Sequence, residues 1–212
     1  MVKYPYAEVL SGSYRMRDTV IDLIRHGEPE GGRCFRGHRV DDPLSERGWE
    51  QMWAAMPATP PWTQIVSSPL QRCRQFAEAL HARHGIAVSV DDRLKEVGFG
   101  EWEGKSPALI QQQDAEAYAA FYRDPVRYRP AGAEPWEEFS TRVSAALDAL
   151  VQDFPGRQVL VVAHAGVVRA VVARVLNADA GAAYRIRVDN AGLTRLRHDG
   201  QRYALEYLNR VA

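Results

Sequence analysis

The feature that most constrains this chain is an alternation between short apolar segments and longer amphipathic ones. Residues 158–163 (QVLVVA) are the most apolar of the short segments, and residues 19–24 and 64–67 are similar in length and composition. Such runs are typical of buried strands. Helical spacing of apolar residues predicts helices over 45–55, 70–84, 135–153 and 166–176. Strands alternating with helices predict an α/β fold, a three-layer α/β/α sandwich around a mostly parallel sheet.

Two parts of the chain depart from this alternation. Residues 91–135 combine a turn-rich stretch with a helical pattern over 108–122, and we expect them to form a small helical cap insertion. Residues 1–18 lack an apolar segment, and we expect a mobile N-terminal arm. Residues 19–212 are then predicted to form one domain. Further strands are predicted at 184–188, 193–198 and 203–208, the last two joined by a hairpin turn at Asp199-Gly200.

Composition excludes several classes of function. The 27 basic residues balance the 27 acidic ones, so no overall positive field attracts nucleic acid or an anionic membrane. No apolar run approaches the roughly 20 residues that span a bilayer. The two cysteines, Cys34 and Cys73, are too few for a disulfide framework, and we expect a reduced, cytoplasmic setting. We therefore expect no nucleic-acid or membrane partner; the sequence does not define an oligomeric state.

Five residues that suit phosphate chemistry stand near the ends of predicted strands. Arg25 and His26 follow the first strand, and Arg72 opens the helix after the second. Glu96 follows the third strand, predicted at 86–90, and His164 follows the most apolar one. In open α/β sheets, ligands bind outside the carboxyl ends of the strands. We therefore expect these side chains to meet in one site.

The residue types match the needs of phosphoryl transfer. Charge spreads over the equatorial oxygens of the transferred group, and the planar guanidinium of arginine binds such oxygens in pairs. A neutral imidazole nitrogen is a good nucleophile, and neighbouring Arg25 and Arg72 favour the neutral form of His26. A carboxylic acid must protonate the leaving oxygen and later deprotonate water. Glu96 is our candidate, with Glu101 and Glu103 as nearby rivals.

Several segments, in order, resemble the histidine phosphatase superfamily: LIRHGE (23–28), RGHRVDDPLSERG (36–48), VSSPLQRCRQFAEAL (66–80), RLKEVGFGEWEG (93–104) and VVAHAGVVRAV (161–171). The Glu-x-x-Phe-Gly form of the fourth segment resembles the phosphatase branch closest to α-ribazole phosphatase. The resemblance implies that His26 is the phosphorylated nucleophile and Glu96 the acid and base. It makes Arg25, Arg72 and His164 phosphate ligands and implies neither a metal nor a cofactor.

The chain departs from this family at one loop. An asparagine that commonly helps to hold phosphate there has no clear counterpart after Glu28. Arg33, Arg36 and His38 are the candidates to replace it, and Glu134 of the cap is a candidate for contact with the leaving group. Substrate binding is therefore expected to differ in detail, while the nucleophile stays the same.

We expect a phosphomonoesterase that acts on a small phosphorylated metabolite, with α-ribazole 5′-phosphate as first choice from the resemblance. A cofactor-dependent phosphoglycerate mutase and a non-catalytic phospholigand-binding module are the alternatives. A cysteine phosphatase is excluded, because its Cys-x5-Arg motif would need arginine where Val40 and Ala79 stand. No phosphate-binding Gly-x4-Gly-Lys-Ser/Thr loop is present either.

Overall fold

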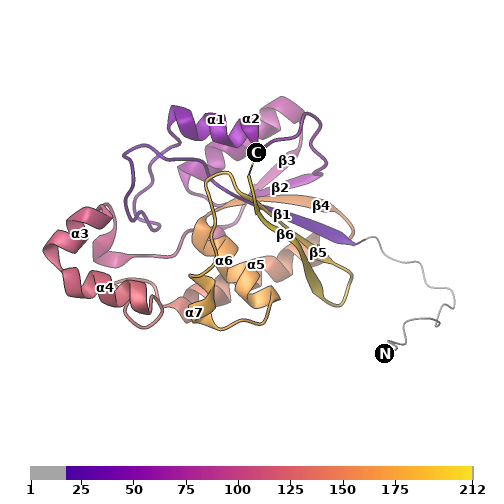
Figure 1. Ribbon diagram of the computed structural model, residues 1–212. Helices are drawn as coiled ribbons and strands as arrows, with labels where there is room; N and C mark the ends of the chain where they lie inside the picture. Colours follow the sequence, from indigo (N-terminus) through magenta and orange to yellow (C-terminus); the bar gives the residue numbers. More distant parts are fainter. Residues whose placement is uncertain (1–17, 212) are drawn as a thin grey trace, which may run out of the picture.

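The computed structural model describes residues 18–211, which contain a six-stranded sheet (Figure 1). Its order is β3-β2-β4-β1-β5-β6. The strands are β1 (Thr19–Arg25), β2 (Gln64–Ser67), β3 (Ala87–Val90), β4 (Gln158–Ala163), β5 (Leu193–His198) and β6 (Tyr203–Arg210). Among these described strands only β5 runs opposite to the rest, since it pairs antiparallel with both β1 and β6. The prediction of a mostly parallel sheet is confirmed.

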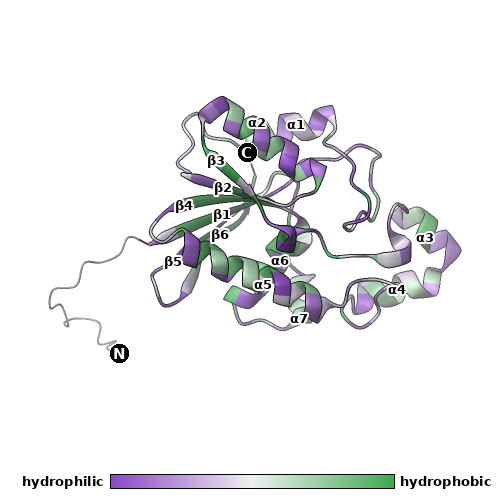
Figure 2. Cartoon of the chain, turned by 180° about the vertical axis from the view of Figure 1, so that it is seen from behind, coloured by the Kyte–Doolittle hydropathy of each residue, from purple (hydrophilic) through white to green (hydrophobic). Residues whose placement is uncertain are grey.

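Helices cover both faces of the sheet (Figure 1). On one face lie α1 (Glu46–Ala54) and α2 (Gln71–His84), and on the other lie α5 (Trp136–Asp153) and α6 (Ala165–Val175). The neighbouring strands β1 to β4 are largely hydrophobic, whereas the helices turn polar residues outward (Figure 2). The predicted three-layer α/β/α sandwich is therefore confirmed.

The apolar run of β4 explains why this strand is central. Alternate residues of a strand point to opposite faces of the sheet. Val159, Val161 and Ala163 belong to the core beneath α5 and α6, while Leu160 and Val162 belong to the core beneath α1 and α2. A strand buried on both faces needs apolar residues at every position, which is what residues 159–163 supply.

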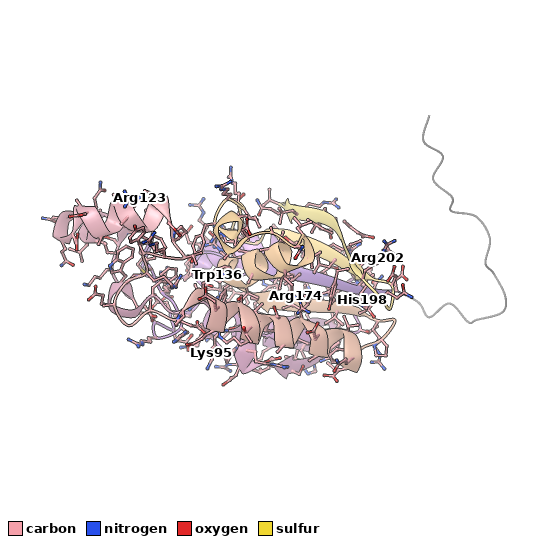
Figure 3. All side chains as sticks on the ribbon, turned by 90° about the horizontal axis from the view of Figure 1, so that it is seen from below. Lys95, Arg123, Trp136, Arg174, His198 and Arg202 are labelled. Atoms are coloured by element: carbon pink, nitrogen blue, oxygen red, sulfur yellow. The ribbon has the colours of Figure 1, made fainter. Side chains whose placement is uncertain are left out.

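Residues 91–135 form the structure that interrupts the alternation. They hold two short 3₁₀ helices, η1 (Asp92–Leu94) and η2 (Gly100–Trp102), and two α-helices, α3 (Pro107–Gln113) and α4 (Ala115–Arg123). An aromatic cluster of Trp102, Phe121 and neighbouring rings packs this region. Figure 3 shows Arg123 of α4 at the opposite end of the molecule from His198 and Arg202. The carboxyl ends of the parallel strands point toward α3 and α4 (Figure 1).

Two local predictions differ from the structure. The expected helix over 108–122 is divided into α3 and α4 at Asp114, whose side chain caps α4 by accepting from the backbone N–H of Ala117. The helix α2 begins at Gln71, one residue later than predicted.

The prediction of a strand at 184–188 is wrong. A short helix, α7 (Ala180–Ala183), is followed there by irregular chain. The backbone carbonyls of this segment bind arginine side chains and no neighbouring strand: Ile186 accepts from Nε of Arg169, and Val188 accepts from Nη1 of Arg25. The apolar residues of this segment pack against the core cluster that includes α6. A buried loop shows the same apolar pattern as a strand, so the sequence did not distinguish the two.

The predicted arm at 1–18 lies outside the described residues, apart from Asp18. Within residues 18–211, none of the helices combines the length and the hydropathy that crossing a membrane requires. Cys34 and Cys73 are both free thiols.

Candidate active site

The strand register brings the two site histidines together. Arg25 of β1 pairs with Ala163 of β4, so the next residues along the two strands, His26 and His164, are neighbours. The backbone N–H of His26 donates to the carbonyl of Ala163 over 2.9 Å. The two imidazole rings meet edge to face with their centroids 5.2 Å apart, and both are buried. Residues 138 positions apart in the chain thus form one site because two parallel strands end at the same level.

His26 has one ring nitrogen in a hydrogen bond and one free for chemistry. Nδ1 lies 2.7 Å from the carbonyl oxygen of Gly27, which can only accept, so Nδ1 carries the proton and Nε2 holds the lone pair. Burial, followed by the charges of Arg72 and Arg25, holds the pKa of His26 well below its usual range. The ring is therefore neutral at neutral pH, with Nε2 in the nucleophilic state.

His164 is the N-cap residue of α6 and is fully buried. Its Nε2 lies 2.7 Å from the hydroxyl oxygen of Ser68 and 3.6 Å from Sγ of Cys73. Burial, and then the charge of Arg72, also lowers the pKa of His164 well below its usual range. Burial raises the pKa of the Cys73 thiol to about 12, so this sulfur is a packing group and not a thiolate nucleophile.

Backbone carbonyls hold the guanidinium groups of Arg25 and Arg72 in place beside the histidines. Arg72 is buried and donates from Nη1 and Nη2 to the carbonyls of Val40 and Gly37. Arg25 donates from Nη1 to the carbonyl of Val188. The Nε atoms of both arginines are buried without a hydrogen-bond partner in the described part of the chain. Orphaned buried donors are costly, and an anionic oxygen in the pocket would satisfy them.

Glu96 lies on the amino end of α6. One carboxylate oxygen accepts from the backbone N–H of Val97 at 2.9 Å and the other from that of Gly166 at 3.2 Å. A Cβ at position 166 would come within 2.2 Å of this carboxylate, so only glycine permits the approach. The helix terminus therefore both positions Glu96 and presents positive potential to the site.

These side chains line a pocket of about 280 Å³ between the strand ends and α3–α4. Its wall includes Arg25, His26, Arg72 and Glu96, together with the predicted contacts Arg33 and Arg36. His164, predicted as a phosphate ligand, is fully buried and is not among the lining residues, and its ring packs against that of His26. Further lining residues are Pro29, Cys34, Phe35, Gly37, Phe99, Pro107, Tyr122 and Arg169. Six of the predicted site residues thus share one wall.

Of the residues predicted to replace the missing loop asparagine, Arg36 makes its contacts within its own loop. It forms an ion pair with Asp42, with Nε 2.9 Å from the carboxylate, and donates to the carbonyls of Glu30 and Gly32. Arg33 is exposed and makes no hydrogen bond or ion pair with any residue in 18–211. Of these two, Arg33 is the guanidinium available to a ligand.

His38 and Glu134 lie behind the pocket and not on its wall. Nδ1 of His38 is 3.2 Å from the backbone carbonyl oxygen of Glu96. Glu134 pairs with Arg142, at 2.6 Å and 2.8 Å, and accepts from the backbone N–H of Gly98. Arg142 in turn donates to the carbonyl of Glu96. Both predicted contacts therefore support the loop that carries Glu96.

The structure separates Glu96 from its two rivals. The carboxylate of Glu103 accepts from the backbone N–H groups of Arg39 and Phe99, which joins two loops. Glu101 is exposed. Among the three glutamates, only Glu96 lines the pocket.

Sequence reasoning missed three polar residues around the pocket. Arg169 and Tyr122 line it, and the side-chain amide of Asn190 donates to the backbone carbonyl of His26 at 3.0 Å. Arg169 carried a usable signal, because it is the one charged residue in the apolar stretch 165–173. Tyr122 and Asn190 had none, since their positions depend on how distant segments fold back.

The fold and site together define a class of α/β protein with a pocket at the carboxyl edge of a parallel sheet, lined by arginines beside two neutral histidines. The family model described as "Histidine phosphatase superfamily (branch 1)" matches residues 21–211. The chain belongs to the histidine phosphatase superfamily, as its sequence segments predicted.

Individual relatives agree with this placement. An adenosylcobalamin/alpha-ribazole phosphatase of Escherichia coli is 30% identical over 171 residues, which cover 79% of this chain and 84% of that protein. The structure of a mycobacterial glucosyl-3-phosphoglycerate phosphatase is 28% identical, with a TM-score of 0.78, and the match covers 91% of this chain and 99% of that one.

A further relative is longer than this chain. A protein of Mycobacterium tuberculosis named as bifunctional is 32% identical over 176 residues, which cover 81% of this chain but 48% of that protein. The chain thus spans about half the length of this relative.

Proposed function

We propose that the protein is a phosphomonoesterase that acts on a small phosphorylated metabolite through a phosphohistidine at Nε2 of His26. The observation that carries this proposal is the bond from Nδ1 of His26 to the carbonyl of Gly27. It leaves Nε2 unprotonated in a pocket that also holds two arginines with orphaned Nε donors. A nucleophile beside a preformed site for phosphate oxygens is what phosphoryl transfer requires.

The reaction follows in two steps. In the first, Nε2 of His26 forms a bond to phosphorus while the ester P–O bond breaks, and protonated Glu96 gives its proton to the leaving oxygen. In the second, Glu96 takes a proton from water, whose oxygen bonds to phosphorus as the P–N bond breaks. Arg25 and Arg72 hold the phosphoryl oxygens throughout, and His164 packs against the ring of His26.

Candidate substrates come from the relatives. α-Ribazole 5′-phosphate is the substrate named for a solved Escherichia coli relative, and glucosyl-3-phosphoglycerate is named for the mycobacterial structure. A panel of both, with p-nitrophenyl phosphate as a generic ester, measures which is hydrolysed with the highest kcat/KM. Isomerisation of a phosphoglycerate that depends on 2,3-bisphosphoglycerate would instead identify a mutase, and binding without turnover would identify a phospholigand-binding module.

The test of the nucleophile is the variant His26→Ala. We expect turnover of p-nitrophenyl phosphate to fall by about 10³-fold or more, because no covalent intermediate can form. His84→Ala is the matched control, since His84 lies at the end of α2, away from the pocket. Mass spectrometry after an alkaline quench should show an added phosphoryl group, roughly 80 Da, on the wild type and His84→Ala only. Full activity of His26→Ala would refute the proposal.

A further inference from the structure

The pocket holds more positive charge than the phosphoryl group alone explains. Besides Arg25 and Arg72, its wall contains Arg33, from the loop after β1, and Arg169, from α6. Neither Arg33 nor Arg169 forms an ion pair with an acidic residue in the described part of the chain, unlike Arg36, which is paired with Asp42. Two arginines of the wall, in addition to Arg25 and Arg72, thus form no ion pair with a carboxylate in residues 18–211.

Arg169 is held in a fixed orientation. Its Nε donates to the backbone carbonyl of Ile186 at 3.0 Å, and its guanidinium carbon lies 5.7 Å from the centre of the Tyr184 ring. These contacts fix the guanidinium plane while its terminal nitrogens make no hydrogen bond with residues 18–211. A planar fork with free terminal donors is the form in which arginine binds a carboxylate or a phosphate.

Tyr122 shares the wall of one pocket, of about 280 Å³, with Arg33 and Arg169. Partial burial and the neighbouring Tyr118 raise the pKa of the Tyr122 hydroxyl to about 12, and the charges of Arg33 and Arg169 oppose that rise. Tyr122 belongs to α4 and lines the pocket on the side away from the strand ends, where the leaving group of a bound ester would lie.

The charges of the wall indicate what the leaving group must carry. A phosphomonoester dianion meets Arg25 and Arg72, and Glu96 is the one carboxylate among the lining residues. Since Glu96 must hold a proton when the ester breaks, it neutralises neither of the remaining arginines at that moment. Clustered like charges with no counter-ion repel one another, so a second anion between Arg33 and Arg169 would be favoured.

We propose that Arg169 and Arg33, with the Tyr122 hydroxyl, form a second anion subsite, and that the substrates are phosphomonoesters whose leaving alcohol carries an anionic oxygen group such as a carboxylate. This inference rests on the proposed phosphomonoesterase function. It ranks a phosphorylated hydroxy acid above α-ribazole 5′-phosphate, whose leaving alcohol carries no anion.

The test compares two esters that differ only at the proposed anion. 3-Phosphoglycerate and glycerol 3-phosphate share a phosphorylated three-carbon chain, but the first ends in a carboxylate and the second in a hydroxymethyl group. We expect kcat/KM to be about tenfold or more higher for 3-phosphoglycerate, because a charge-assisted bidentate contact forms only with it. Equal kcat/KM for the two esters would overturn the inference.

Three variants assign the preference to Arg169. Arg169→Gln should reduce the ratio of the two kcat/KM values toward one, and Arg169→Lys should restore part of it, because lysine keeps the charge but loses the bond to Ile186. Arg174→Gln, on the same helix but bound to Asp148 and outside the pocket (Figure 3), should keep the wild-type ratio. If Arg169→Gln lowers both values equally, Arg169 attracts any phosphate, and the second subsite is refuted.

The failures of the two proposals are distinguishable. Hydrolysis of glycerol 3-phosphate that is lost in His26→Ala supports the phosphomonoesterase whatever the preference for the carboxylate. If neither ester nor p-nitrophenyl phosphate is hydrolysed, the phosphomonoesterase fails, and the second subsite fails with it.

Discussion

At the scale of single residues, the two histidines of the pocket owe their charge state to the same surroundings. Burial removes the water that would stabilise an imidazolium, and Arg72 adds a repelling charge to both rings. His26 lies next to Arg25 in the chain and faces Arg72 only through the fold. The His26 ring is therefore kept neutral by burial, by one neighbour in the chain and by one distant residue.

The depressed pKa of His26 predicts an acid-tolerant enzyme. Because the pKa lies well below the ordinary value of 6.5, the free base persists as the pH falls through 6.5. We expect the acid limb of kcat/KM for p-nitrophenyl phosphate to lie below pH 6.5, and to move upward in Arg72→Gln, which loses a repelling cation. A wild-type limb at 6.5, unchanged in the variant, would contradict this account.

A glycine on α6 is predicted to be needed for catalysis. In Gly166→Ala the new methyl group would meet the Glu96 carboxylate at 2.2 Å and displace it from the helix terminus. We expect kcat to fall about 10²-fold, as for a lost general acid, while the fold stays intact by circular dichroism. Gly181→Ala is the control, since a Cβ there meets nothing within 4 Å. Wild-type kcat in Gly166→Ala would refute the role given to this contact.

At the scale of elements, one buried carboxylate joins the parallel and antiparallel parts of the sheet. Asp22 of β1 is fully buried and accepts hydrogen bonds from Arg195 of β5, Tyr207 of β6 and the indole N–H of Trp62, just before β2. Its distances to Arg195 are 2.8 Å and 2.9 Å. A buried charge is tolerated here because each of its neighbours donates to it.

Removal of this carboxylate should loosen the antiparallel edge of the sheet. Asp22→Ala leaves Arg195 and Trp62 without their acceptor, and we expect the free energy of unfolding to fall by about 3–5 kcal/mol. Asp18→Ala breaks the exposed pair with Arg197 and should cost about 0–1 kcal/mol. Urea denaturation of both variants measures the difference. Similar losses for the two would show that burial of Asp22 does not strengthen its contacts.

At the scale of the whole molecule, the same two histidines connect stability to pH. In the folded protein His26 and His164 stay neutral well below 6.5, whereas in the unfolded chain both take up protons near that value. Below 6.5 the unfolded state therefore binds more protons, and acid favours unfolding.

The free energy of unfolding is accordingly predicted to fall as the pH is lowered from 7 through 6.5 toward 5. Urea titrations at several pH values measure this slope, and His26→Gln should flatten it, because that variant cannot take up the proton. His84→Gln serves as the control, since His84 is outside the buried pair. If the free energy of unfolding does not change between pH 7 and 5, the two rings take up protons in the folded protein as readily as in the unfolded chain, which would contradict this account.

The sequence by itself determined the fold class, the family and the residues closest to the expected chemistry. The reason is that the spacing of apolar residues in a segment shows which of them are buried. Strongly apolar segments directly precede or contain the four site residues Arg25, His26, Arg72 and His164. Because parallel strands deliver their carboxyl ends to one edge, these residues had to meet.

Only the tertiary structure decided which carboxylate joins them and what surrounds the leaving group. Glu96 was selected over its neighbours by a hydrogen bond to Gly166, seventy residues away. Arg169 was turned into the pocket by the carbonyl of Ile186, in a segment whose apolar pattern predicted a strand. Side-chain direction in irregular segments depends on such long-range contacts, which no local periodicity contains.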